Sequence, residues 1–443
     1  MTSVLSRRRG QPSSGRIYFL SFTADGADGI CRTQAVVANE LVERHEVEII
    51  SLYKRRKELT YPLDERIRVV DLYDARPVGP KGKPYGGRVR AKDHPERGRI
   101  KAWLDSRQSL SAPRADDPSV SLFSDLLIRS KLRSLPPGVL VSTRPSLHAA
   151  AAKYAPRHLA LVGWEHMHLE AREMQPRMMD RLLQTVPRLD GLVTLTEGDR
   201  RAWAERLTDS DLVLEAIPNA VPWEVGTASS LDQKVIVSGG RFVERKGFQR
   251  LVQAYAPVAR KHPDWQLHLW GRGPEEDSVA EEIRRQGVEQ QVIMKGHSDE
   301  FDKVLGEATI FANGALYEGF GMVMTEALSK GVPLVAFDVP IGPQEIVQDG
   351  VNGRLVADGD MQGFADALLQ LIEDEALRRR MGADAQVTAR EYGIDAIGRR
   401  WDDLIDRVVT DRLATGRTAS GRNPADRVPD RGPTDQDVRD RTD

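Results

Sequence analysis

The segment from Ala308 to Phe337 constrains the fold more than any other part of the chain. An apolar run over 308–312 predicts a buried strand, and a glycine-containing turn follows it. Residues 322–330 have the pattern of a helix that ends at a glycine, and 332–337 predict the next strand. Strand, turn, helix and strand in this order present a helix N-terminus at the carboxyl edge of a parallel sheet. The sequence therefore predicts an α/β fold with a ligand site beside this turn.

The turn and the helix behind it contain two glycines and two glutamates that suit a sugar ligand. Gly319 and Gly321 have no Cβ, so the backbone can approach a ligand closely. Glu318 lies in the turn and Glu326 on the second turn of the helix, which lets both face one crevice. Their carboxylates accept hydrogen bonds from sugar hydroxyls but do not bind phosphate. The alternative for a bare pair is two solvated glutamates at a helix start, because 29% of the residues are charged.

A second glycine turn follows the strand predicted over 234–238 and carries two basic residues. Arg241 and Lys246 bracket this turn, and fixed cations beside glycine amides suit a diphosphate. Taken without the rest of the sequence, Arg241 and Lys246 have a simpler interpretation as two exposed basic residues that bind no ligand.

The N-terminal part begins with a strand, turn, helix and strand over 16–52, where the turn after the first strand ends at Gly29. This turn sits where an α/β sheet binds nucleotides, but it lacks the G-x-G-x-x-G pattern, so a plain connecting loop is an equal alternative. A later predicted strand, 159–164, is followed directly by His166 and His168. A histidine at a strand end is more often structural, and its place at the carboxyl edge raises the expectation of a functional role.

Length and composition favour two globular domains. A chain of 443 residues is too long for one ordinary core, and its net charge of −2 gives no whole-chain argument for nucleic acid. A single cysteine excludes an internal disulfide framework. The predicted segments are a disordered N-terminus 1–14, an N-terminal domain 15–221, a linker 222–233, a C-terminal domain 234–395, a helix 396–413 that crosses back to the first domain, and a disordered tail 414–443.

The segment 76–107 is basic and rich in helix breakers. A solvated, mobile insertion is the simpler interpretation. The alternative is a basic lip for an anionic acceptor or a lipid head group. No apolar run is long enough to span a membrane, so a cytoplasmic protein is expected, with peripheral contact at the inner face of the membrane as the alternative.

Glu318 and Glu326 match the E-x7-E motif of the retaining glycosyltransferases of family 4, and the chain resembles that family over roughly residues 16 to 410. The resemblance implies the GT-B architecture, in which two Rossmann-like, doubly wound domains face a central cleft. One departure is Gly314-Ala315, where the family often has Pro-Ser, which puts the local hydrogen bonding of that turn in doubt.

The resemblance also implies roles for single residues. Glu318 and His166 would be catalytic, with Glu318 holding the donor sugar, His166 contacting the sugar or the leaving group, and His168 as the second candidate. Glu326 would hold the ribose, and the loop 295–298 would hold the base. The remaining residues expected to bind the donor are Gly29, Arg241, Lys246, Gly319, Phe320, Gly321 and Met322.

The expected activity is transfer of a hexosyl group from a nucleotide-diphospho-sugar, with UDP favoured, to a hydroxyl acceptor with retention of configuration, in cell-envelope or polymer glycan synthesis. The acceptor is expected to be anionic or lipid-linked, and no nucleic acid partner is expected. No cofactor or metal is expected either, although D-x-D spacing occurs at 209–211 and 358–360. Two alternatives are a nucleotide-sugar 2-epimerase of the same fold, which needs no acceptor, and a non-catalytic sugar-nucleotide-binding protein.

Overall fold

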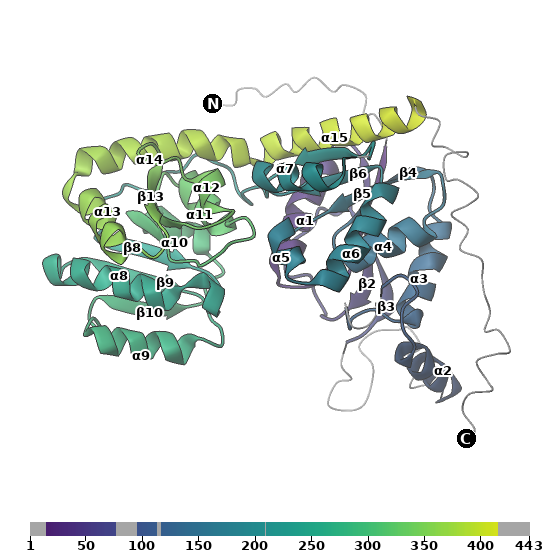
Figure 1. The fold of residues 1–443 in the computed structure, drawn as a ribbon, viewed down its shortest axis with the longest axis horizontal. Helices are drawn as coiled ribbons and strands as arrows, with labels where there is room; N and C mark the ends of the chain where they lie inside the picture. Colours follow the sequence, from purple (N-terminus) through teal and green to yellow (C-terminus); the bar gives the residue numbers. More distant parts are fainter. Residues whose placement is uncertain (1–14, 77–94, 113–116, 209, 415–443) are drawn as a thin grey trace.

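The computed structural model describes residues 15–76, 95–112, 117–208 and 210–414. The two predicted disordered ends lie outside these ranges, except for Ala414, which is the last residue of a helix. Two lobes with central parallel sheets lie side by side in Figure 1, and long helices run along one side of both. The chain is therefore an α/β protein of two Rossmann-like domains.

The N-terminal domain is built on a parallel sheet of seven strands in the order β3-β2-β1-β4-β5-β6-β7. Its strands are β1 (Arg16–Ser21), β2 (Glu46–Lys54), β3 (Arg68–Asp74), β4 (Gly138–Ser142), β5 (Leu159–Trp164), β6 (Gly191–Thr194) and β7 (Val213–Ala216). Its helices are α1 (Gly29–Leu41), α2 (Pro95–Ser106), α3 (Leu122–Arg133), α4 (Pro145–Tyr154), α5 (Leu169–Glu173), α6 (Pro176–Thr185) and α7 (Glu197–Arg206). The order reverses at β1, so the turn after β1 lies at the switch point where such sheets bind ligands.

The C-terminal domain is built on a parallel sheet of six strands in the order β10-β9-β8-β11-β12-β13. Its strands are β8 (Val235–Gly239), β9 (Gln266–Trp270), β10 (Val292–Gly296), β11 (Ile310–Asn313), β12 (Leu334–Asp338) and β13 (Gly353–Ala357). Its helices are α8 (Phe248–Lys261), α9 (Glu276–Gln286), α10 (Phe301–Glu307), α11 (Met322–Ser329), α12 (Pro343–Ile346), α13 (Met361–Glu373) and α14 (Glu375–Ala389), with a 3-10 turn η3 (Glu244–Lys246) before α8. Here the order reverses at β8, next to β11 and the turn that leads into α11.

The predicted strand, turn, helix and strand around α11 are all present, with boundaries that differ from the prediction by one or two residues. Strand β12 begins at Leu334, two residues later than predicted. Pro333 has no N–H to donate to a sheet, and Val332 donates its N–H to Ala327 O (3.1 Å) at the end of α11. These two residues therefore close the helix before the strand can start.

The basic segment was only partly interpretable from the sequence. Residues 95–106 form α2, which packs against α3 and exposes Ile100 and Trp103 to solvent. The interpretation of 76–107 as a solvated, mobile insertion stays a prediction. The preceding residues 77–94 lie outside the described ranges.

Helix α15 (Ile394–Ala414) returns to the N-terminal domain, where it packs against α1, β5 and β7. Trp401 on this helix is fully buried, and its ring lies 4.8 Å from that of Trp164 at the end of β5. A single apolar cluster includes both rings together with Met324 and Leu328 of α11. The hydrophobic core is therefore continuous across the boundary between the domains.

A carboxylate of the C-terminal domain also caps a helix of the other domain. Glu345 on α12 accepts hydrogen bonds from the backbone N–H of Gly198 (2.7 Å) and of Glu197 (3.3 Å) at the start of α7. A Cβ on Gly198 would lie 2.8 Å from Oε1 of Glu345, so a larger residue at 198 would require the end of the Glu345 side chain to shift. The free N–H groups of a helix start favour such an anion.

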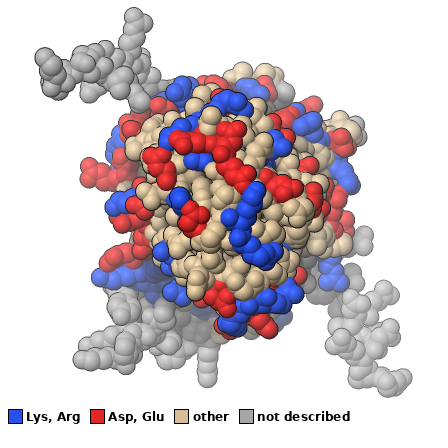
Figure 2. Space-filling view, turned by 90° about the vertical axis from the view of Figure 1, so that its left-hand side faces the viewer, with Lys and Arg blue, Asp and Glu red and all other residues tan. Residues whose placement is uncertain are grey.

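Basic and acidic side chains are interspersed on the end of the molecule formed by the C-terminal domain (Figure 2). This face carries no broad patch of one sign. Among the described helices, none combines the length and the apolar character needed to cross a membrane.

We predict that Trp401→Ala destabilises the protein by about 3–5 kcal/mol, because it removes a large, fully buried side chain from the cluster that joins the domains. Urea unfolding followed by circular dichroism measures this change. Val409→Ala is the control, since Val409 lies on the same helix and is 39% exposed, and its effect should stay within about 0.5 kcal/mol. Equal effects of the two substitutions would contradict the prediction.

Candidate active site

Two turns at the carboxyl edge of the C-terminal sheet pack backbone against backbone. Gly247 follows η3 in a left-handed conformation (φ +59°), and a Cβ on it would lie 1.9 Å from Gly314 O. Gly314 in turn packs against Gly247 O, and its own carbonyl accepts from Arg250 Nε (2.6 Å). The departure from Pro-Ser at 314–315 therefore has a structural reason, because a side chain at 314 would separate the turn of Lys246 from the turn of Glu318.

Glu318 lies between two cations of the η3 turn. Its side chain is only 5% exposed, Lys246 Nζ donates to Oε1, and Arg245 lies 3.8 Å from Oε2. Sequence reasoning predicted Glu318 and Lys246 as neighbours of one ligand, and the structure brings them into direct contact. Arg245 was not predicted. Arg241 is exposed and makes no ion pair with any described residue.

Glu326 on α11 is paired with a residue of the other domain. Its side chain is 3% exposed, and Arg32 on α1 lies 2.8 Å from its Oε1. Burial raises the pKa of the Glu326 carboxyl, and the charge and hydrogen bond of Arg32 and the charge of Lys246 oppose that rise. Arg32 was missed because nothing in the local pattern around it points to a partner so distant in the sequence.

The N-terminus of α11 meets the N-terminus of α1 across the domain boundary. Gly321 caps α11 in a left-handed conformation (φ +97°), and Met322 is the first residue of the helix. A Cβ on Gly29 would lie 3.0 Å from Met322 Cε, and one on Gly319 would lie 3.4 Å from His166 O. Predicted residues from both domains thus lie beside one another. Phe320 is instead buried (4% exposed) against Tyr392, so only its backbone faces the turn.

His166 follows β5, and its ring centroid lies 4.5 Å from that of Trp164. Its Nε2 is buried and has no hydrogen-bond partner among the described residues. Burial lowers the pKa of His166 to about 3, so the ring is neutral at physiological pH. The runner-up His168 caps α5 and also has no partner for either ring nitrogen within the described ranges. Burial lowers the pKa of His168 as well.

A buried polar network beside His166 was not predicted. Glu165 accepts from Arg172 Nη2 (2.8 Å) and contacts His148 Nε2 (3.0 Å), whose Nδ1 lies 2.7 Å from Ser142 Oγ. Arg172 and His148 hold the pKa of the fully buried Glu165 carboxyl at about 2, although burial alone would raise it. The network joins the ends of β4 and β5 to α4 and α5, and it thereby fixes the backbone that presents His166.

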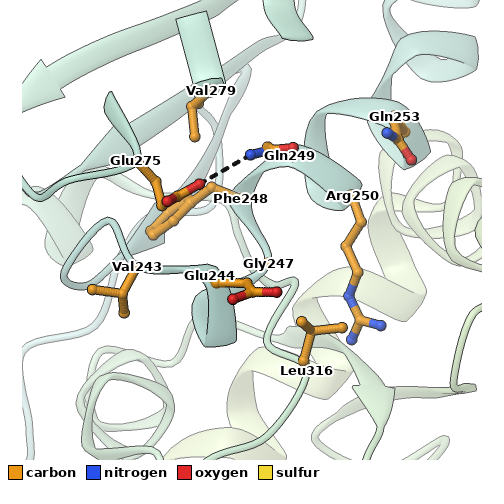
Figure 3. Close-up of a pocket in the computed structure, with 10 residues that line it drawn as sticks. All are labelled: Val243, Glu244, Gly247, Phe248, Gln249, Arg250, Gln253, Glu275, Val279 and Leu316. Atoms are coloured by element: carbon orange, nitrogen blue, oxygen red, sulfur yellow. Dashed lines mark hydrogen bonds between the residues drawn. The ribbon is translucent and has the colours of Figure 1, made fainter. Parts of the chain in front are cut away.

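Two cavities open in the C-terminal domain. One of about 210 Å³ lies between η3, α8 and α9 (Figure 3), where Gln249 donates to Glu275 across it (3.2 Å), and none of its ten lining residues is a predicted site residue. The other, of about 680 Å³, lies against β8, β9 and α10. Trp270, Lys295 and Ser298 line it, and the last two belong to the predicted base-binding loop.

The D-x-D segments have structural partners where they are described. Asp358 pairs with Arg250 (2.6 Å), and Asp360 caps α13 by accepting from Gly363 N (2.8 Å). Asp209 lies outside the described residues. Within the described ranges, no three His, Cys, Asp or Glu side chains are grouped to hold a metal ion.

The site thus combines cations, backbone N–H groups at a helix start and two buried carboxylates. The cations and the start of α11 can stabilise negative charge on a diphosphate, and the carboxylates can accept hydrogen bonds from hydroxyls. In the other domain, the neutral His166 has an unpaired ring nitrogen, and its backbone carbonyl lies beside Gly319.

Comparison with known proteins identifies the C-terminal domain. Residues 223–388 match the family model of the glycosyl transferases group 1. The chain is 31% identical, over 89% of its length, to an exopolysaccharide phosphotransferase of Streptomyces coelicolor, and this match covers 41% of that protein. It is 25% identical, over 58% of its length, to a poly(ribitol-phosphate) alpha-N-acetylglucosaminyltransferase of Staphylococcus aureus, of which the match covers 52%. The chain therefore spans about half the length of these relatives.

Solved structures show the same two-domain arrangement. A mutant of S. aureus TarM, in complex with UDP and alpha-GlcNAc-glycerol, superposes with a TM-score of 0.67 at 16% identity, over 88% of this chain and 99% of that one. The pneumococcal O-GlcNAc transferase GtfA, in complex with UDP and GlcNAc, gives a TM-score of 0.67 at 15% identity, over 90% of this chain and 99% of that one. Residues 223–388 therefore form a glycosyl transferases group 1 domain, within a GT-B fold of two Rossmann-like domains.

Proposed function

We propose that the protein transfers a hexosyl group from a UDP-linked sugar to a hydroxyl acceptor during synthesis of a cell-envelope polymer, as a retaining glycosyltransferase of family 4. The observation that carries this proposal is the contact of Lys246 with Glu318 at the start of α11, beside the buried Glu326. The η3 turn thereby offers a cation for a diphosphate, and the residues around the start of α11 offer two acceptors for hydroxyls.

The names of similar proteins support the acceptor class. The staphylococcal relative acts on poly(ribitol-phosphate), and a Bacillus subtilis relative is a poly(glycerol-phosphate) alpha-glucosyltransferase. The Streptomyces relative carries the name of a phosphotransferase, but residues 223–388 match the model of the glycosyl transferases group 1, and for this reason we favour glycosyl transfer. An anionic polyol-phosphate polymer is the acceptor that we favour.

In the proposed reaction, the bond between the anomeric carbon and the diphosphate oxygen breaks while the acceptor oxygen bonds to that carbon. Negative charge develops on the leaving diphosphate, and Arg241, Lys246 and the amides from Gly319 to Met322 stabilise it. Glu318 orients the sugar hydroxyls and Glu326 the ribose, and the base lies towards Trp270 and Ser298. No metal or cofactor takes part in this scheme.

Retention of configuration follows if the acceptor attacks the face that the diphosphate leaves. The acceptor proton then passes to a departing phosphate oxygen, so no separate protein base is needed. His166 is neutral and has an unpaired ring nitrogen, so it serves as a hydrogen-bond partner of the sugar or the leaving group, not as an acid.

Two other functions use the same donor site. A nucleotide-sugar 2-epimerase would invert C2 of the bound nucleotide-sugar without an acceptor, and a non-catalytic binding protein would bind UDP without turnover. The pairing of both carboxylates with cations supports a sugar-nucleotide site in the transferase, the epimerase and the binding protein alike. Only the transferase would turn over with an acceptor.

Helix α2 is the surface that we propose for peripheral contact with the inner face of the membrane. Ile100 and Trp103, one turn apart on this helix, are 59% and 53% exposed, and the Arg107 guanidinium lies 4.8 Å from the centroid of the Trp103 ring. Exposed apolar side chains beside a cation suit the boundary of an anionic bilayer. This contact would bring the site to a lipid-linked or membrane-associated polymer.

The proposed donor site predicts that UDP, at about 100 times its Kd, stabilises the protein by roughly 2.7 kcal/mol in a thermal-shift assay, and more than GDP or ADP does. Glu326→Gln should abolish the shift, because the amide replaces the charged acceptor of the ribose hydroxyls. Glu282→Gln is the matched control, since Glu282 is a buried, ion-paired glutamate on α9 outside the site. No shift with any nucleotide would contradict the proposed function.

With an α-linked UDP-hexose and a polyol-phosphate acceptor, we expect an α-linked product by NMR, and a β-linkage would contradict retention.

His166→Gln should lower kcat about 10- to 100-fold, consistent with the loss of a hydrogen bond in the transition state. Because the pKa of His166 is lowered to about 3, its ring does not titrate between pH 5 and 9. The pH profiles of the variant and the native enzyme should therefore have the same shape, and a limb near pH 6.5 that vanishes in the variant would be evidence against this role.

For the membrane contact, replacing both Ile100 and Trp103 by Asp should reduce co-sedimentation with phosphatidylglycerol vesicles at least several-fold, because the negative charge repels the anionic lipid. Met174→Asp is the control, since Met174 is 82% exposed on the surface beyond α5. Unchanged sedimentation of the double variant would exclude α2 as the contact.

A further inference from the structure

Arg32 is a residue of the N-terminal domain that reaches into the predicted nucleotide site of the other domain. It lies in the first turn of α1, three residues after Gly29, and its Nη2 lies 2.8 Å from Glu326 Oε1 on α11. Its guanidinium is also 6.0 Å from the ring centroid of Trp223, whose Nε1 donates to Ser329 Oγ at the end of α11 (2.9 Å). Arg32 is thus held against the C-terminal domain by an ion pair and an aromatic ring.

The two oxygens of Glu326 are used differently. Arg32 contacts Oε1, whereas no described residue donates a hydrogen bond to Oε2. The Glu326 side chain is 3% exposed and the Arg32 side chain 26% exposed, so the ion pair is shielded from water chiefly on the carboxylate side. The carboxylate therefore still has an acceptor available while it is bound to Arg32.

We propose that Arg32 is a positioning residue of the donor site, which holds the Glu326 carboxylate charged and correctly oriented so that its free oxygen accepts the ribose hydroxyls. This inference rests on the proposed function, because it assigns the ribose to Glu326. It adds a determinant of donor affinity that comes from the domain opposite the nucleotide-binding one.

The physical need for such a partner follows from the burial of Glu326. A buried carboxylate without a nearby cation takes up a proton, and a protonated carboxyl is a poorer acceptor for two hydroxyls. The charged groups that face Glu326 are Arg32 from α1 and Lys246 from η3, and Lys246 is already bound to Glu318. Arg32 is therefore the cation that Glu326 itself depends on.

The position of Arg32 also couples nucleotide affinity to the approach of the two domains. When the domains separate, the 2.8 Å contact is lost, and Glu326 is left both less charged and less oriented. The opposite possibility is that Arg32 competes with the ribose for Glu326. That possibility predicts tighter nucleotide binding when Arg32 is removed, whereas the positioning role predicts weaker binding.

The test compares UDP with 2′,3′-dideoxy-UDP by calorimetry on the full chain, in the native protein and in Arg32→Met. The native protein should bind UDP more tightly than the dideoxy analogue. Arg32→Met should weaken UDP binding about 10- to 100-fold and leave the affinity for the dideoxy analogue unchanged, because only UDP offers hydroxyls to Glu326. Arg32→Lys, which keeps the charge but not the planar fork, should lie between the two.

Arg44→Met is the matched control, because Arg44 lies just beyond the same helix and pairs with Asp402 (2.6 Å) outside the site. It should leave both affinities unchanged, and thermal unfolding without ligand shows whether each variant is folded. An equal loss for UDP and its dideoxy analogue, no loss, or a gain in UDP affinity in folded Arg32→Met would overturn the inference. If the native protein binds neither nucleotide, the proposed function fails instead.

Discussion

Two buried carboxylates at one helix start can coexist only because each has a cation from a different part of the chain. Glu318 and Glu326 are both almost fully buried, and the start of α11 alone cannot neutralise two negative charges. Lys246 from the η3 turn and Arg32 from the opposite domain supply the missing charge. The close packing of Gly247 on Gly314 is what places Lys246 within reach, so the backbone geometry and the electrostatics of the site depend on each other.

The sequence was informative wherever the signal is local. The glycines and glutamates between 318 and 326 predicted the turn, the helix and the residues around a ligand, because a strand, a turn and a helix of one unit must lie together. The shifted start of β12 has a local cause as well, in Pro333. Arg32 and the network around Glu165 could not be predicted in the same way, since their partners come from elements that only the tertiary fold brings together.

The roles that the resemblance implied differ in how the structure places them. Lys246 is paired with Glu318, and Glu326 is paired separately with Arg32, whereas Arg241 is exposed. Phe320 belongs to the core and offers only its backbone to the turn. Glu318 and Glu326 are the buried charged residues among these, so each needs a cation beside it. Substitutions of these two residues must therefore be checked for their effect on folding as well as on ligand binding.

The cap that Glu345 provides for α7 has a consequence for how the domains move. A carboxylate on a partly exposed helix start contributes only about 1 kcal/mol, and water can replace it at both N–H groups when the domains part. Because the cap joins Glu345 of one domain to the N–H groups at the start of α7 in the other, it forms only when the two domains lie close together. The cap is therefore a small, reversible contribution to the approach of the domains, beside the apolar cluster that both domains share.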